Sequence, residues 1–459
     1  MAKQFAVQPR QTARVKTKFR KIVTDIPAPK SLPMLEALRR AEPLSMTGQP
    51  PVLWDKAKGC QVFDRWGNVW LDWSCGVLVA SAGHGRREIA AAMQKVIQKP
   101  LLHNYCFPSE YRAKLTAKIV ELAPPGLDKC FLLTTGAEGV ECIIKLARAH
   151  GQAVAGPHKN IVVTFNGDFH GRTLGSQLAG GSPALKAWIG PTMDQGFVQV
   201  DFPGNIRTRN PSFDGFLAAL AAQGATPEQV CLVLPETYQG GSAAFLPLEF
   251  ARRLREWTAE NKIVLGFDEV QAGFGRCGTL WGFEYYGVVP DVFCLGKGMA
   301  SSMPISAVVG KPELMDLFAP NSMTSTHTGN PVCCAAALAS IDLILKEKLA
   351  RKAEKMGEVL HAGLNRVRER FPMNIAAVQG RGMVAGVHLI KPGAGLEPDA
   401  EAAFNIVERC MEKGLLMFAP VGVGGATVKI APPLITPKPA LQEGLAVFEA
   451  AVAEVLGGR

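Results

Sequence analysis

Five short apolar runs in the middle of the chain constrain the fold most strongly. Each has the length of a strand, and stretches with helical spacing separate them; the runs cover residues 131–133, 161–165, 230–234, 263–267 and 292–295. Strands that are apolar throughout and alternate with helices are typical of a parallel sheet covered on both faces. We therefore predict an α/β domain around a mostly parallel sheet between residues 128 and 310.

Polar groups follow each of these runs. The endings are Thr134-Thr135-Gly136, Asp168-Phe169-His170, Glu236, Asp268-Glu269 and Lys297. In sheets of this kind, ligands bind beyond the carboxyl ends of the strands. Five polar endings at one edge therefore predict a binding site there.

Lys297 and Asp268 are the most specific pair among these endings. A lysine at the end of a buried strand is costly to desolvate unless it is bonded to something. A Schiff base to an aldehyde cofactor would remove its full charge and anchor the cofactor covalently. Asp268 could hold a pyridine nitrogen protonated and Gln271 could address a ring oxygen, although a capping acid before a flexible loop is the alternative. The pair predicts a pyridoxal-phosphate enzyme.

Two further segments allow both a functional and an ordinary interpretation. Small residues from Gly136 open a helix and leave backbone N–H groups for a phosphate, or they form a tight turn. Phe169, followed by His170, could stack on a flat cofactor ring, or it could be ordinary packing.

Composition excludes several classes of protein. Of 459 residues, 47% are apolar and 20% are charged, which permits a large core and excludes global disorder. No uncharged apolar run approaches the roughly 18 residues of a membrane span, so no membrane partner is expected. Eleven scattered cysteines without a C-x-x-C motif indicate reduced thiols and a cytoplasmic location. The histidines form no cluster with them, so no metal site is expected.

Residues 1–30 are basic and carry seven Lys or Arg before Asp25, which accounts for most of the net charge of +10. The segment has no apolar core and is not expected to be a secretory signal. A targeting or nucleic-acid-binding tail is one interpretation. We favour a solvated arm that drapes over a partner subunit. Because the remaining chain has no basic stripe, no nucleic-acid partner is expected.

Two local signals lie outside the central runs. Residues 62–70 predict a hairpin with its turn at Gly67-Asn68. Asn330-Pro331 predicts the cap of a long helix over residues 332–349.

The order and spacing of several motifs resemble the class III aminotransferases, which are fold type I pyridoxal-phosphate enzymes. The resemblance runs from Val62 to Phe448, and the motifs are Gly83-His84, Gly136-Ala137-Glu138, Phe169-His170-Gly171-Arg172-Thr173, the stretch 268–297, Thr326, Gly329-Asn330-Pro331, Arg381-Gly382-Met383 and Ala431-Pro432-Pro433-Leu434. It implies transfer of an amino group between an amine or amino-acid donor and an oxo-acid acceptor. It also implies three regions: an N-terminal segment joining the small domain (1–75), a large cofactor-binding domain (76–335) and an α+β C-terminal small domain (336–459).

The resemblance assigns roles to matching positions. The implied cofactor-binding residues are Gly136, Ala137, Phe169, His170, Glu236, Asp268, Val270, Gln271, Lys297 and Thr326. Lys297 and Asp268 would be catalytic, the lysine as proton carrier and the carboxylate as partner of the ring nitrogen. Val270 and Phe169 would lie on opposite ring faces. Thr326 would reach the cofactor phosphate of a neighbouring subunit, which implies an obligate homodimer or a tetramer with shared sites.

The chain departs from the family at a substrate-binding pair. Gly241 stands where many members have a glutamate, and Lys429 stands where its partner arginine would bind a substrate carboxylate. Lysine lacks the planar fork that binds a carboxylate through two bonds. We therefore expect an amine, an amide or lactam, or a substrate with a distant carboxylate, and Lys429 and Gln239 are the candidate substrate residues. Lys429 replacing the arginine is one alternative, and His327 also departs from the family's usual phenylalanine.

The altered pair also keeps a second activity open. The same family contains racemases and epimerases, which return the proton to the substrate's α-carbon. Racemisation of an amino acid, amide or lactam is therefore the alternative to transamination.

Overall fold

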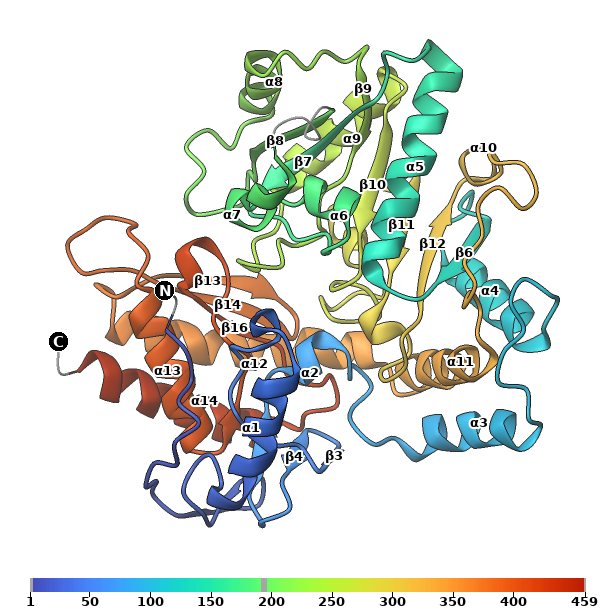
Figure 1. Cartoon of the computed structure of the whole chain (residues 1–459). Helices are drawn as coiled ribbons and strands as arrows, with labels where there is room; N and C mark the ends of the chain where they lie inside the picture. Colours follow the sequence, from blue (N-terminus) through green and yellow to red (C-terminus); the bar gives the residue numbers. More distant parts are fainter. Residues whose placement is uncertain (1–2, 191–195, 458–459) are drawn as a thin grey trace. The chain divides into compact units, whose positions relative to one another are not determined.

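The computed structural model describes residues 3–190 and 196–457 (Figure 1). The chain divides into two compact units. One comprises Met1–Arg86 together with Arg351–Arg459, and the other is continuous from Arg87 to Ala350.

A seven-stranded sheet forms the centre of the continuous unit. Its order is β6-β12-β11-β10-β9-β7-β8, with bounds β6 Lys129–Leu133, β7 Ile161–Asn166, β8 Phe197–Asp201, β9 Val230–Val233, β10 Val264–Asp268, β11 Val292–Leu295 and β12 Ser306–Gly310. The pairs within β11-β10-β9-β7-β8 are parallel, and β12 is antiparallel to both its neighbours. The prediction of a mostly parallel sheet is confirmed, and β8 and β12 were not among the predicted runs.

The sheet is buried because helices cover it. Every residue of β9, β10 and β11 is buried, as expected for central strands. Helix α5 (Gly136–Ala155) packs its apolar side against these strands through Val140, Ile143 and Ala147 (Figure 1). The other helices of the unit are α3 Arg87–Gln98, α4 Glu110–Leu122, α6 Leu174–Ala179, α7 Pro183–Lys186, α8 Phe213–Ala222, α9 Leu248–Glu260, α10 Pro312–Met315 and α11 Pro331–Lys346, with 3-10 turns η3 Ala187–Ile189, η5 Gly282–Tyr286 and η6 Lys297–Met299.

The predicted cap of α11 is confirmed. The Asn330 side chain accepts hydrogen bonds from the N–H groups of Val332 (3.0 Å) and Cys333 (3.2 Å). The helix ends at Lys346, earlier than predicted, and the next helix begins at Leu349.

The discontinuous unit contains two sheets. One has the order β1-β2-β5-β4-β3 with β15 paired to β5, and the other has the order β13-β14-β16. The strands are β1 Val15–Lys16, β2 Lys21–Ile22, β3 Lys56–Lys58, β4 Gln61–Phe63, β5 Val69–Asp72, β13 Ile375–Arg381, β14 Val384–Leu389, β15 Leu415–Leu416 and β16 Thr427–Ile430. The helices are α1 Leu32–Ala41, α2 Cys75–Leu78, α12 Leu349–Arg370, α13 Ala400–Glu412 and α14 Lys438–Leu456, with 3-10 turns η1 Pro29–Ser31, η2 Leu44–Met46 and η7 Val423–Gly425. The predicted hairpin is the antiparallel pair β4–β5.

The basic N-terminal segment packs on its own chain. Phe5 stacks on Phe404 of α13, with ring centres 4.3 Å apart. Arg10 Nη1 lies 2.8 Å from Oε2 of Glu408, and Ile26 is buried. A few apolar side chains therefore anchor the segment to its own unit, while five of its seven Lys and Arg residues are exposed. The expectation that it drapes over a partner subunit stays a prediction. Residues 1 and 2 lie outside the described residues.

Among the described residues, no helix combines the length and apolar character needed to cross a membrane. All eleven cysteines are free thiols.

Candidate active site

Three central strands bring the predicted lysine and carboxylates to one edge of the sheet. Glu236, just beyond β9, forms a parallel bridge with Asp268 at the end of β10. Asp268 lies opposite Cys294 of β11, and Lys297 comes three residues after Cys294. Parallel pairing in this register therefore places all three functional side chains at the carboxyl end.

Lys297 has an unusual backbone and a perturbed amine. Its φ of 37° lies in the left-handed region, and Gly296 and Gly298 flank it. Burial lowers the pKa of Lys297, against the opposing effect of the Asp268 and Glu236 carboxylates. A lower pKa increases the neutral amine, which is the form that attacks a carbonyl group.

Asp268 is held by a backbone group and an imidazole. Its Oδ1 accepts a hydrogen bond from the Val270 N–H (3.0 Å), and its Oδ2 lies 2.9 Å from Nδ1 of His170. Burial lowers the pKa of His170, but the carboxylates of Asp168 and Asp268 outweigh this effect and raise that pKa to about 10. The imidazole of His170 therefore lies between two carboxylates and contacts Asp268 through Nδ1.

Glu236 connects the sheet edge to the loop that carries Phe169. Its Oε2 accepts hydrogen bonds from the N–H groups of Phe169 (2.9 Å) and Gly240 (3.0 Å). Its Oε1 lies 3.5 Å from Nε2 of Gln271. Burial, reinforced by the nearby Asp168 carboxylate, raises the pKa of Glu236 to about 8. Glu236 thus positions Phe169, whose ring is partly exposed.

The side-chain amide of Gln239 makes all its hydrogen bonds with other groups of the protein. Its Nε2 donates to the Asn166 carbonyl (2.8 Å) and to Oδ1 of Asp168 (3.1 Å). Its Oε1 accepts from Asn205 Nδ2 (2.8 Å) and Ser242 Oγ (2.9 Å). These contacts use both amide hydrogens and both oxygen lone pairs, so the structure places Gln239 as a support for Asp168.

Val270 packs between the start of α5 and the lysine loop. A Cβ at Gly136 would lie 2.8 Å from Cγ1 of Val270, and a Cβ at Gly296 would lie 3.3 Å from the same atom. Glycine at position 136 is therefore required by the close approach of the valine. The helix start and the lysine loop therefore both lie against the same methyl group of Val270.

The first turn of α5 offers free backbone donors. Thr135 caps the Glu138 N–H, and Oε2 of Glu138 accepts from the N–H groups of Thr134 (2.8 Å) and Thr135 (3.0 Å). The N–H groups of Gly136 and Ala137 have no acceptor within the helix, because they belong to its first turn. Such a helix start is suited to bind a phosphate group.

Thr326 and Lys429 are not among the residues grouped at this edge. Thr326 is exposed on the segment between β12 and α11. Lys429 is buried in β16, opposite Gly386 of β14, in the discontinuous unit. The substrate role of Lys429 stays a prediction.

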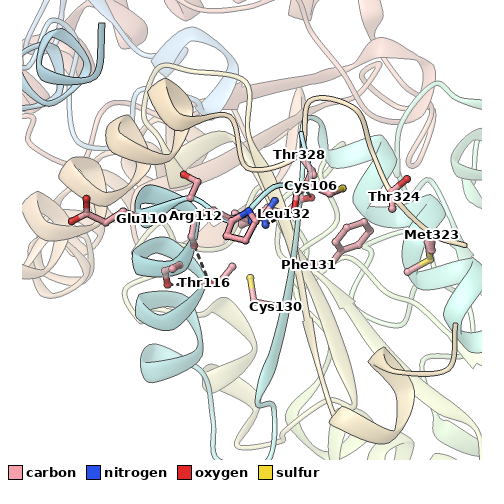
Figure 2. A pocket seen from close by; sticks show the side chains of 13 residues that line it. Cys106, Glu110, Arg112, Thr116, Cys130, Phe131, Leu132, Met323, Thr324 and Thr328 are labelled. Carbon is pink, nitrogen blue, oxygen red and sulfur yellow. Dashed lines mark hydrogen bonds between the residues drawn. The ribbon is translucent and has the colours of Figure 1, made fainter. Parts of the chain in front are cut away.

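A separate pocket of about 640 Å³ lies beside the Thr326 segment. Figure 2 shows side chains that line it from α4, β6 and the segment 323–328, among them Arg112, Cys130 and Thr328. Thr328 Oγ1 donates a hydrogen bond to the Leu132 carbonyl. The pocket contains none of the predicted cofactor-binding residues.

Sequence reasoning missed three residues at the site. Asp168 was noted as a strand ending, but its contact with His170 was not. Glu269 accepts hydrogen bonds from the N–H groups of Gly282 (2.6 Å) and Phe283 (3.0 Å), which anchors the loop after Val270. Arg172 places its guanidinium 5.4 Å from the centre of the Phe169 ring. The only sequence signal was their position in the same motifs.

Comparison with known proteins identifies the family. The family model described as "Aminotransferase class-III" matches residues 45–452. The 5-aminovalerate aminotransferase of Pseudomonas putida is 34% identical, over 88% of this chain and 94% of that protein. The acetylornithine aminotransferase of a Nostoc species is 31% identical, over 90% of this chain and 92% of that protein.

A solved structure agrees in fold and cofactor. The ornithine aminotransferase of Toxoplasma gondii, whose structure reveals partial occupancy of pyridoxal phosphate at its active site, has a TM-score of 0.82 and 25% identity. The match covers 93% of this chain and 95% of that chain. The relatives support transamination rather than the racemase alternative. The chain belongs to the class III aminotransferases and is a pyridoxal-phosphate-dependent enzyme with a fold type I architecture.

Proposed function

We propose that the cofactor binds where β9, β10, β11 and the start of α5 meet. Lys297 anchors its aldehyde carbon, Asp268 pairs with its ring nitrogen, and the N–H groups of Gly136 and Ala137 hold its phosphate. The observation that carries this proposal is that the Gly136 and Gly296 backbones approach the same methyl group of Val270, so the phosphate donors and the lysine loop lie close together. The residues therefore fit the group in charge.

The remaining residues complete the proposed binding slot. Val270 covers one ring face and Phe169 the other, since the Phe169 backbone is held in place by Glu236. Gln271 faces the phenolic oxygen. Burial raises the pKa of Glu236, which weakens the repulsion between its carboxyl group and Asp268.

Lys297 carries the proton in the proposed reaction. Bound pyridoxal phosphate supplies an electron sink for the carbon that carries the amino group. Lys297 moves the proton between that carbon and the C4′ position of the cofactor, and its lowered pKa makes it a more available base. Asp268 keeps the proton on the ring nitrogen. Lys297→Ala should abolish turnover while the apoprotein remains folded by circular dichroism, and turnover within tenfold of wild type would refute the assignment.

We propose an amine donor whose carboxylate lies far from the amine, with an oxo acid as acceptor. The name of the Pseudomonas putida relative describes a primary amine several bonds from a carboxylate. Gly241 and Lys429 replace the usual carboxylate-binding pair. Arg172 supplies a cation beside Phe169 that suits a distant carboxylate.

A screen of amine donors tests this substrate class. The holoenzyme is mixed with 5-aminovalerate, with its amide, with butylamine and with an α-amino acid, and loss of the cofactor's absorption band is followed. We expect 5-aminovalerate to react fastest, and Arg172→Ala to raise its KM about tenfold, as loss of one charged contact does. Arg252→Ala, on the exposed side of α9, is the control. Preference for the α-amino acid that is lost in Lys429→Ala would instead show that Lys429 replaces the arginine.

We further propose a homodimer with shared active sites. Leu102 and Phe107, exposed by 56% and 73%, precede α4. Cys106 and Pro108, which flank Phe107, line the pocket of Figure 2. Tyr105 Oη lies 3.2 Å from Thr324 Oγ1, so the segment that carries Leu102 and Phe107 contacts the segment that carries Thr326. A patch of this kind is typical of an interaction surface. Light scattering of the wild type should give twice the chain mass of 49.2 kDa. The variant Phe107→Glu should give the mass of one chain. A monomeric wild type would refute the proposal.

A cytoplasmic location completes the proposal. It is supported by eleven cysteines that form no disulfide, which is usual in a reducing compartment. Fractionation of cells that express the tagged chain would test it.

A further inference from the structure

A buried row of charged side chains runs from the end of β7 to the end of β10. His170 contacts a carboxylate on each side: Nδ1 lies 2.9 Å from Oδ2 of Asp268, and Nε2 lies 3.5 Å from Oδ2 of Asp168. All three side chains are buried, and Gln239 holds the other oxygen of Asp168 at 3.1 Å. Within the described residues, Nε2 of His170 and Oδ2 of Asp168 have no hydrogen-bond partner, and they face each other.

The position of one proton follows from these contacts. Nδ1 of His170 must carry a hydrogen to donate to the Asp268 carboxylate. If Nε2 carried none, two buried acceptors would face each other, which costs free energy. A second proton therefore lies between His170 and Asp168. Burial raises the pKa of Asp168, but imidazole is the stronger base, so this proton stays on His170.

We infer that Asp168 and His170 are positioning residues that form a buried ion pair, in which His170 is a cation and Asp168 balances its charge. The result is an alternating row of Asp168 (negative), His170 (positive) and Asp268 (negative). Its open end would face the positively charged ring nitrogen of the cofactor. Without Asp168, His170 would lose its second proton, and its hydrogen bond to Asp268 would no longer be charge-assisted, so Asp268 would be held less firmly beside the ring nitrogen. This last consequence rests on the role proposed above for Asp268, whereas the ion pair does not.

The other ionisable groups near the pair leave the inference intact. Glu236, beyond β9, faces both carboxylates and has its Oε2 occupied by two backbone N–H groups. Lys297 faces Asp268 and Glu236. On α5, the carboxylate that contacts this loop is Glu141, whose Oε1 accepts hydrogen bonds from Thr173 (2.6 Å) and from the Ser176 N–H (3.0 Å).

Nitrogen-15 NMR of the apoprotein tests the ion pair directly. The chain has eight histidines, and His170→Gln assigns the signals of His170 by their loss. At pH 8, where a histidine with an ordinary pKa of about 6.5 is neutral, we expect both nitrogens of His170 to carry a hydrogen. In Asp168→Asn, which keeps the shape of the side chain, we expect Nε2 to lose that hydrogen. An unprotonated Nε2 in the wild type, or an unchanged signal in the variant, would overturn the inference.

Cofactor binding tests the consequence separately. Asp168→Asn should weaken equilibrium binding of pyridoxal phosphate about tenfold, the factor that corresponds to one pKa unit of coupling. Asp201→Asn is the matched control. Asp201 is an exposed carboxylate at the end of β8, the strand paired with β7, and it accepts a hydrogen bond from Asn166. Unchanged binding in Asp168→Asn would overturn the positioning role. If instead Asp268→Asn left binding unchanged, the proposed role of Asp268 would fail while the NMR result for the ion pair would stand.

Discussion

Replacing Gly136 by alanine should push the start of α5 away from Val270. The added Cβ would lie 2.8 Å from Cγ1 and 3.0 Å from Cγ2 of Val270, closer than the 3.4 Å at which ordinary contact begins. Val270 is fixed by its place directly after Asp268 and Glu269, so the start of α5 must move. We therefore expect Gly136→Ala to weaken both folding and phosphate binding.

The size of the effect follows from two opposing contributions. Forcing an extra methyl group into a filled site costs about 1–3 kcal/mol. Alanine favours the helix over glycine by at most about 1 kcal/mol, and less at its first residue. The net change should be about 1–2 kcal/mol less stability for the apoprotein. Cofactor affinity should fall about tenfold, because 1.4 kcal/mol corresponds to that factor.

Urea unfolding of the apoprotein and cofactor titration measure the two effects. Val270→Ala removes the methyl groups that the new Cβ would meet, so the double variant should be more stable than the sum of the single changes by about 1 kcal/mol. Gly296→Ala is the matched control. Its Cβ meets the same valine at 3.3 Å and its backbone is extended, so its cost should be smaller. Additive single effects, or an equal cost at both glycines, would refute the packing argument.

Three other perturbations should have measurable effects. Burial raises the pKa of Glu269 to about 7, so the folded protein retains a proton on this carboxyl group that the unfolded chain releases. The unfolding free energy of the wild-type apoprotein should therefore fall between pH 4.5 and 7, by about 3 kcal/mol more than that of Glu269→Gln. Urea unfolding at each pH measures this difference. An equal slope in both proteins would contradict this. Asn330→Ala removes the acceptor for the first N–H groups of α11 and should cost about 1 kcal/mol of unfolding free energy; Asn330→Asp, which keeps the acceptor, should recover most of it. Phe5→Ala removes the stack on Phe404 and should expose residues 3–30 to limited proteolysis, whereas substitution of the exposed Lys18 should not.

The central strands could be predicted because each is a buried apolar run, and the strand ends then located Glu236, Asp268 and Lys297. β8 was missed because Gln199 and Asp201 interrupt its apolar residues and only Val200 among its five residues is fully buried. β12 was missed because its apolar run is only Ala307–Val309, flanked by Ser306 and Gly310. His170 can contact both Asp168 and Asp268 because β7 and β10 lie on either side of β9. No local sequence pattern specifies this strand order.

In the N-terminal segment, the expectation of exposure holds for most Lys and Arg residues and fails for apolar side chains between them. The segment's many positive charges predicted exposure, but a side chain such as Phe5 is buried when an apolar partner is available elsewhere in the fold. Phe404 is about four hundred residues away in the chain, so the sequence around Phe5 contains no sign of it.

The strand order also determines when this enzyme can become complete during synthesis. β6 is the first strand of its sheet to leave the ribosome and lies at one edge, where its only neighbour is β12, the last strand of that sheet to be made. Until residue 310 emerges, β6 has no partner in the sheet and its backbone groups remain open to other chains. The lysine and the helix start that serve the same ligand are likewise made far apart in time. A nascent chain that stalls between β11 and β12 would therefore carry every cofactor-binding residue of the sheet edge and still present an unprotected strand, which is a point at which a chaperone is most useful.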